Sequence, residues 1–71
     1  METYDIDRFR VAYVNALNSL SKRRALIFAL NVLGIDRGDI ATERVFPDGG
    51  EPLDLEDDEL QFRLRMLDGR L

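Results

Sequence analysis

Apolar residues recur at three- and four-residue spacing along the first part of the chain. Between residues 5 and 20 they fall within about 100° of one helical face, so the pattern predicts an amphipathic helix over residues 5–20. Asp5 or Thr3 can cap its start, and Asp7 in the first turn suits the positive end of the helix dipole. The apolar positions are Ile6, Phe9, Tyr13, Ala16, Leu17 and Leu20.

A second helix is predicted over residues 22–33. Ser21 is a favourable N-cap, and Gly34 follows the last periodic residue. Ile35 can then contact Leu30, which is the Schellman pattern of helix termination.

This second helix is apolar around nearly its whole circumference, and such a helix must be enclosed on all sides. Two further helices in so short a chain cannot easily enclose it. We therefore expect the chain to form a homo-oligomer, most simply a dimer. The alternative is that the following loop folds back over the helix. The apolar residues are Ala25, Leu26, Ile27, Phe28, Ala29, Leu30, Val32 and Leu33.

Glycine and proline gather in residues 36–53, which predicts a long loop. Its glycines and prolines are Gly38, Pro47, Gly49, Gly50 and Pro52. Within this loop, Asp39 could cap one or two helical turns over residues 40–43. Val45 and Phe46 are then placed to hold the loop against the core.

The apolar residues of the last segment fit two different periodicities. Alternation of apolar and polar residues over 60–66 is typical of a half-buried strand. A helix also fits, since Asp54 can cap it, acidic residues load its start and Gly69 can end it. We favour the helix, in which Phe62 and Met66 form a second apolar patch. Its core stripe is Leu60, Leu64, Leu67 and Leu71.

The predicted fold is therefore mainly α: one domain over residues 1–71, built as a small bundle of three helices with a long Gly/Pro loop. An α+β fold with a C-terminal strand at 60–66 is the alternative. The helix faces left apolar on the outside give the expected oligomer interface. Its residues are Ile27, Phe28, Leu30, Phe62 and Met66.

Charge is distributed unevenly along this chain, whose net charge is −4. Between Val45 and Phe62 there are seven acidic residues and no basic one. Such a field attracts basic partners and repels phosphate backbones. The acidic residues are Asp48, Glu51, Asp54, Glu56, Asp57, Asp58 and Glu59, and we expect the last five of these to bind a partner.

Catalysis and metal binding find little support in the composition. The chain has no His and no Cys, which removes the usual proton-transfer group, the thiol nucleophile and the common zinc ligands. Asp54, Glu56 and Asp58 have the alternate spacing of a calcium loop, but Glu59 occupies the position where that loop requires glycine. We expect no enzyme activity, no cofactor and no metal.

No apolar run approaches the ~18 residues of a membrane span, and the first residues are acidic where a signal peptide is basic. We therefore expect no membrane partner and a cytoplasmic location, in a cell or in an infected host.

A helix-turn-helix is the alternative function class. Leu33, Gly34 and Ile35, followed by Ile40, match the glycine turn and its apolar flanks. The segment that would be the recognition helix is acidic, however, so direct binding of nucleic acid is not expected.

One set of residues within less than half of the chain follows the spacing of a known family. These residues are Leu33, Gly34, Ile35, Ile40, Phe46, Leu55, Glu59, Leu60, Phe62 and Leu64. The stretch resembles the first helix end, loop and acidic second helix of acyl carrier proteins. Asp54 occupies the position of the prosthetic-group serine, so the resemblance implies a helical fold with an acidic recognition face and no carrier chemistry.

The pattern as a whole favours a small non-enzymatic interaction protein. We expect an inhibitor or adaptor that presents its acidic residues to a basic surface of a larger partner, including a surface built for nucleic acid. An inhibitor encoded by a phage or mobile element, acting against a host defence system, fits this size and composition.

Overall fold

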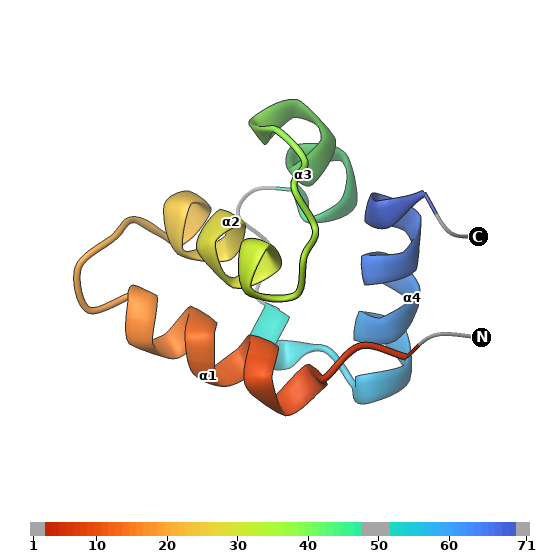
Figure 1. Ribbon diagram of the computed structural model, residues 1–71, viewed down its shortest axis with the longest axis horizontal. Coiled ribbons are helices and arrows are strands. Elements are labelled where there is room, and N and C mark those ends of the chain that lie inside the picture. Colours follow the sequence, from red (N-terminus) through yellow and green to blue (C-terminus); the bar gives the residue numbers. More distant parts are fainter. Residues whose placement is uncertain (1–2, 48–51, 70–71) are drawn as a thin grey trace.

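The computed structural model describes residues 3–47 and 52–69, and in these segments the chain is helical and contains no strand. The prediction of a mainly α fold is confirmed (Figure 1). The elements in chain order are α1 (Ile6–Ala16), α2 (Lys22–Val32), α3 (Asp39–Val45), the short 3-10 helix η2 (Pro52–Asp54) and α4 (Asp57–Asp68).

α1 and α2 form an antiparallel hairpin (Figure 1). Asp5 caps α1 as predicted, since its carboxylate accepts a hydrogen bond from the Arg8 backbone N–H at 3.1 Å. Ser21 caps α2 through its hydroxyl oxygen, which accepts from the Arg24 backbone N–H. α1 ends at Ala16, four residues before the predicted end, because the chain turns there towards α2.

The predicted Schellman ending of α2 is confirmed. Gly34 has a φ of 83°, a left-handed conformation that glycine adopts without a Cβ penalty. The Ile35 N–H donates to the Leu30 carbonyl and the Gly34 N–H donates to the Asn31 carbonyl, both at 2.9 Å. Gly69, with a φ of 74°, ends α4 in the predicted way.

α3 lies inside the expected loop, and its seven residues make about the two turns predicted there, although it extends beyond residues 40–43 at both ends. Gly38, and not Asp39, is its N-cap. The Thr42 hydroxyl donates to the Gly38 carbonyl at 3.0 Å, which satisfies this buried side chain. Phe46 is 1% exposed and holds the end of α3 in the core, as predicted. The expected turn at Gly49 and Gly50 lies outside the described residues.

The last segment is a helix, so the alternative strand over residues 60–66 is wrong. The prediction that Asp54 caps this helix is also wrong, because Asp54 belongs to η2 and Glu56 is the N-cap. The predicted core stripe is confirmed for Leu60, Leu64 and Leu67, all buried, while Leu71 lies outside the described residues.

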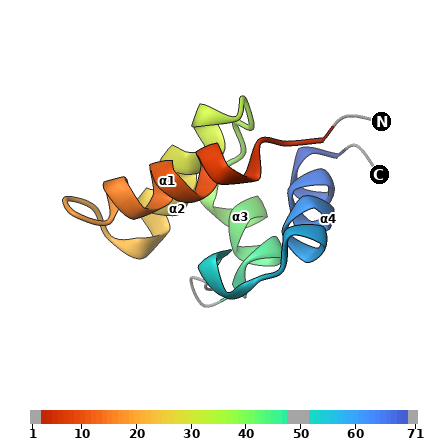
Figure 2. The same cartoon turned by 90° about the horizontal axis from the view of Figure 1, so that it is seen from below.

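The core joins one face of every α-helix. α2 is enclosed to a large extent by its own chain, as the loop-folding alternative required, and Leu30 is only 1% exposed. Seen from two directions, α4 stands at the far end of the molecule from the α1–α2 turn, with α3 between them (Figures 1 and 2). The buried apolar residues are Ile6, Phe9, Tyr13, Ala16, Ala25, Leu26, Ala29, Leu30, Ile35, Phe46, Leu60, Leu64 and Leu67.

The two faces of α4 allow a test of this packing. Leu64→Ala removes a side chain with 0% exposure and should cost about 2–5 kcal/mol. That is comparable to the whole stability expected of so small a core. Phe62→Ala, at a side chain 47% exposed, should cost much less. Urea unfolding followed by circular dichroism measures both, and equal losses would contradict the orientation of α4.

Candidate functional site

An open cleft lies where the beginning of the chain meets the beginning of α4. Its volume is about 590 Å³. Residues more than 50 positions apart in the sequence face each other across it. The lining residues are Thr3, Tyr4, Asp5, Ile6, Asp7, Asp57, Asp58, Gln61 and Arg65.

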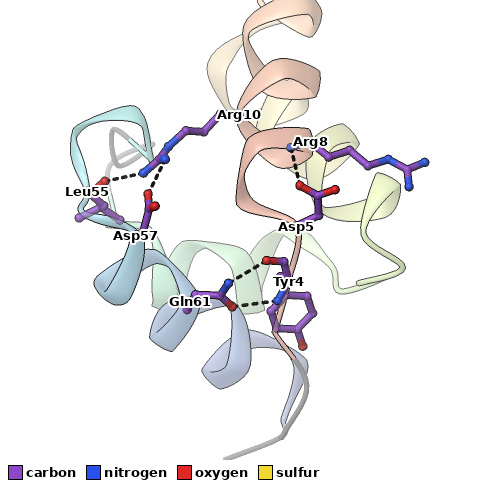
Figure 3. A network of polar contacts seen from close by, with 7 residues as sticks. All are labelled: Tyr4, Asp5, Arg8, Arg10, Leu55, Asp57 and Gln61. Atoms are coloured by element: carbon purple, nitrogen blue, oxygen red, sulfur yellow. Dashed lines mark hydrogen bonds and ion pairs between the residues drawn. The ribbon is translucent and has the colours of Figure 1, made fainter.

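A paired hydrogen bond between a side-chain amide and the backbone closes one side of this cleft. The Tyr4 backbone N–H donates to Gln61 Oε1 at 2.9 Å, and Gln61 Nε2 donates to the Tyr4 carbonyl at 2.7 Å (Figure 3). The Tyr4 hydroxyl also donates to Asp68 Oδ2 at 2.6 Å. The extended segment before α1 is therefore attached to α4 at both its backbone and its side chain.

Arg10 makes the second connection between α1 and the start of α4. One guanidinium nitrogen lies 2.6 Å from Asp57 Oδ1, and the other donates to the Leu55 carbonyl at 2.8 Å (Figure 3). The Asp57 side chain is still 71% exposed. The side chain of Arg8, two residues earlier, extends from the opposite side of α1 and points away from Asp57 (Figure 3).

The charge of the cleft is strongly negative. Four carboxylates and one guanidinium, that of Arg65, line it, which gives the lining a formal charge of −3. Arg10, just outside the lining, offsets the charge of Asp57. Asp5 and Asp7 stand at the start of α1, and Asp57 and Asp58 at the start of α4. The positive ends of two helix dipoles therefore offset part of the repulsion between the carboxylates. The arrangement suits a cationic side chain.

The structure brings together only part of the predicted partner-binding set. Asp57 and Asp58 line the cleft, whereas Asp54, Glu56 and Glu59 are exposed outside its lining. Glu59 instead forms an ion pair with Arg63 at 3.1 Å, one helical turn away. Asp48 and Glu51 lie outside the described residues.

Sequence reasoning missed Asp5, Asp7 and Gln61 as residues of this site. It assigned the two aspartates to helix capping and the dipole of α1, which is correct but incomplete. No period or motif links residues 4 and 61. The only sequence signal is that Gln61 is an uncharged polar residue in a segment otherwise rich in charge.

The residues predicted for an oligomer interface come from two helices, α2 and α4. Phe28 on α2 is 48% exposed, and Phe62 and Met66 on α4 are 47% and 43% exposed. Ile27 is half-buried. Leu30 is buried in the core of the single chain, so its assignment to an interface is wrong.

The described part of the chain contains neither a metal-binding cluster nor a membrane-spanning helix. Within residues 3–47 and 52–69, no three carboxylates stand close enough to hold a metal ion, the acidic cleft included. None of the helices described is both long enough and apolar enough to cross a membrane.

In comparisons with known proteins, the sequence matches no protein-family model, no curated protein and no solved structure.

The attachment of Tyr4 to Gln61 predicts a local effect of substitution. Gln61→Met keeps the length of the side chain but removes both hydrogen bonds, each of which contributes about 0.5–1.5 kcal/mol. Hydrogen exchange at the Tyr4 amide should become fast in this variant. Tyr4→Phe is the matched control, because it removes the hydroxyl that contacts Asp68 and keeps both backbone hydrogen bonds. An equally protected Tyr4 amide in Gln61→Met would show that the attachment does not form in solution.

Proposed function

We propose that this chain is a non-enzymatic protein-protein interaction module that binds a basic surface of a larger partner through its acidic cleft, as an inhibitor or an adaptor. One observation carries the proposal: carboxylates from the two ends of the chain converge on one cleft with a formal charge of −3. Such convergence concentrates the field at one place instead of spreading it over the surface.

Three of these carboxylates are available to a partner. Asp5, Asp7 and Asp58 are exposed, and none forms an ion pair with another residue in the part of the chain that the structure describes. Asp5 uses one carboxylate oxygen for the helix cap, which leaves the other oxygen free to accept. Arginine is the best-matched ligand, because its planar guanidinium can bind carboxylate oxygens in pairs.

Inhibition is the simplest use of such a site. Surfaces that bind nucleic acid hold arginine and lysine ready for phosphates, and carboxylates can take the place of those phosphates. The small size and the net charge of −4 support this use. A protein encoded by a phage or mobile element and directed at a nucleic-acid-binding host protein fits the same features.

The alternative, a helix-turn-helix regulator, receives less support from the geometry. Six residues separate α2 from α3, where that motif uses a turn of three or four. α3 has only seven residues, and its Glu43 forms an ion pair with Arg23 on α2. Arg44 is then the one basic side chain that α3 itself carries.

Calorimetric titration with an arginine-rich peptide tests the proposal. The variant Asp5→Asn/Asp58→Asn removes two cleft charges, keeps similar shapes and retains a capping residue at position 5. We expect it to weaken binding about tenfold, since exposed charge pairs contribute about 0.2–1 kcal/mol each. We also expect the affinity of the unmodified chain to fall steeply between about 50 and 300 mM salt.

The matched control is Asp54→Asn/Glu56→Gln, which makes the same change in net charge outside the cleft. This control should lose about twofold or less. Equal losses in the two variants would mean that the acidic residues act only as a general field that keeps the protein in solution. Binding of duplex DNA at low salt by the unmodified chain would instead favour the regulator.

A further inference from the structure

The outer side of the α1–α2 hairpin carries a continuous apolar surface that the core does not use. Val11 and Val14 on α1 are 60% and 46% exposed, and Phe28 on α2 is 48% exposed. Three neighbouring hollows, of about 760, 360 and 270 Å³, open along this side. Asn15 lines all three, which shows that they belong to one surface.

Phe28 is the largest side chain of this surface and lines the two larger hollows. The surface therefore has an aromatic projection with a depression on either side of it. A surface of this shape can complement a second copy of itself, because the projection of each copy can enter a depression of the other.

This surface is also electrically neutral, in a chain whose net charge is −4. The charged residues that line its hollows are two acids, Asp5 and Asp7, and two bases, Arg8 and Arg10, so the formal charges cancel. Arg24 stands one helical turn before Phe28 on α2 and forms no ion pair with a described residue. Two copies can therefore approach through this side without the repulsion that their net charge produces elsewhere.

The net charges near the two ends of this surface have opposite signs. Asp5, Asp7 and Arg8 sum to −1 at one end, and Arg24 contributes +1 at the other. Helical spacing puts Asp7, Val11 and Asn15 in one row on α1, and Arg24, Phe28 and Val32 in one row on α2. Because the helices are antiparallel, Asp7 stands near the Val32 end and Arg24 near the Asn15 end. A two-fold axis across the hairpin brings the acidic end of each copy over the basic end of the other.

We propose that the outer side of the α1–α2 hairpin, centred on Val11, Asn15 and Phe28, is the interface of a two-fold homodimer. Two 11-residue helices are about 16 Å long and together about 20 Å wide. Their projected area, about 330 Å², falls below the ~800 Å² per partner of a standard interface. We therefore expect a weak dimer.

Sedimentation equilibrium of the full chain between about 5 and 500 µM tests this inference. We expect a reversible monomer-dimer equilibrium that Phe28→Asp weakens at least tenfold, while circular dichroism shows the helices intact because Phe28 is half exposed in the monomer. Phe62→Asp is the matched control: the same residue type with nearly the same exposure, 47%, but on α4. It should leave the equilibrium unchanged.

The orientation has its own test in a charge exchange. Asp7→Arg and Arg24→Asp should each weaken the dimer several-fold, and the double variant should restore it. A monomer at every concentration, or a loss caused by Phe62→Asp and not by Phe28→Asp, would overturn the interface. Sensitivity to Phe28→Asp without restoration in the double variant would overturn the two-fold arrangement. No peptide is present in these measurements, so their outcome is independent of the acidic cleft.

Discussion

The two hydrogen bonds between the Gln61 amide and the Tyr4 backbone determine how the start of the chain lies against α4. α1 and α4 meet over a small area near their beginnings, and polar groups supply much of that junction. A side-chain amide that bonds both the N–H and the carbonyl of one residue fixes the position and the direction of that segment. With the segment fixed, the aspartates at the start of α1 are held against those at the start of α4, and the acidic cleft follows.

Arginine side chains connect the helices to one another in this chain, which has no cysteine for a disulfide and no histidine for a metal site. Arg37 donates to the Leu67 carbonyl in the last turn of α4, and Arg63 donates to the Val45 carbonyl at the end of α3, both at 2.9 Å. Arg10 does the same at the carbonyl of Leu55, after η2. Carbonyls at helix ends lack partners within the helix, and the forked guanidinium can reach them from a neighbouring element. Three of the nine arginines in this chain are used in this way.

Local features of the fold could be predicted from the sequence because their causes are local. The caps at Asp5 and Ser21 and the glycine endings at Gly34 and Gly69 each depend on residues within one or two turns. The enclosure of α2 could not be predicted in the same way. Leu30 and Phe28 are both apolar, and only the packing of the whole chain decides that one is buried and the other half exposed.

Only one side of the acidic cleft could be predicted from the sequence, because only that side has a local cause. Asp57 and Asp58 are evident as part of an acidic run, and the run itself suggested a basic partner. The contribution of Asp5 and Asp7 depends on a contact across 57 residues of sequence, made by an amide that has no period and no motif. Helix capping and the helix dipole already explain Asp5 and Asp7 at the start of α1, so the sequence offers no reason to expect them in the cleft as well.

Titration of the isotope-labelled protein with an arginine-rich peptide, followed by NMR, tests whether carboxylates from the two ends of the chain bind a ligand as one site. We expect the amide signals of Asp5, Asp7 and Asp58 to shift together along a single binding curve, with the Tyr4 and Gln61 signals following them. Shifts confined to the acidic run around Asp54 and Glu56, with the signals at the start of α1 unchanged, would show that the two ends of the chain do not share a site.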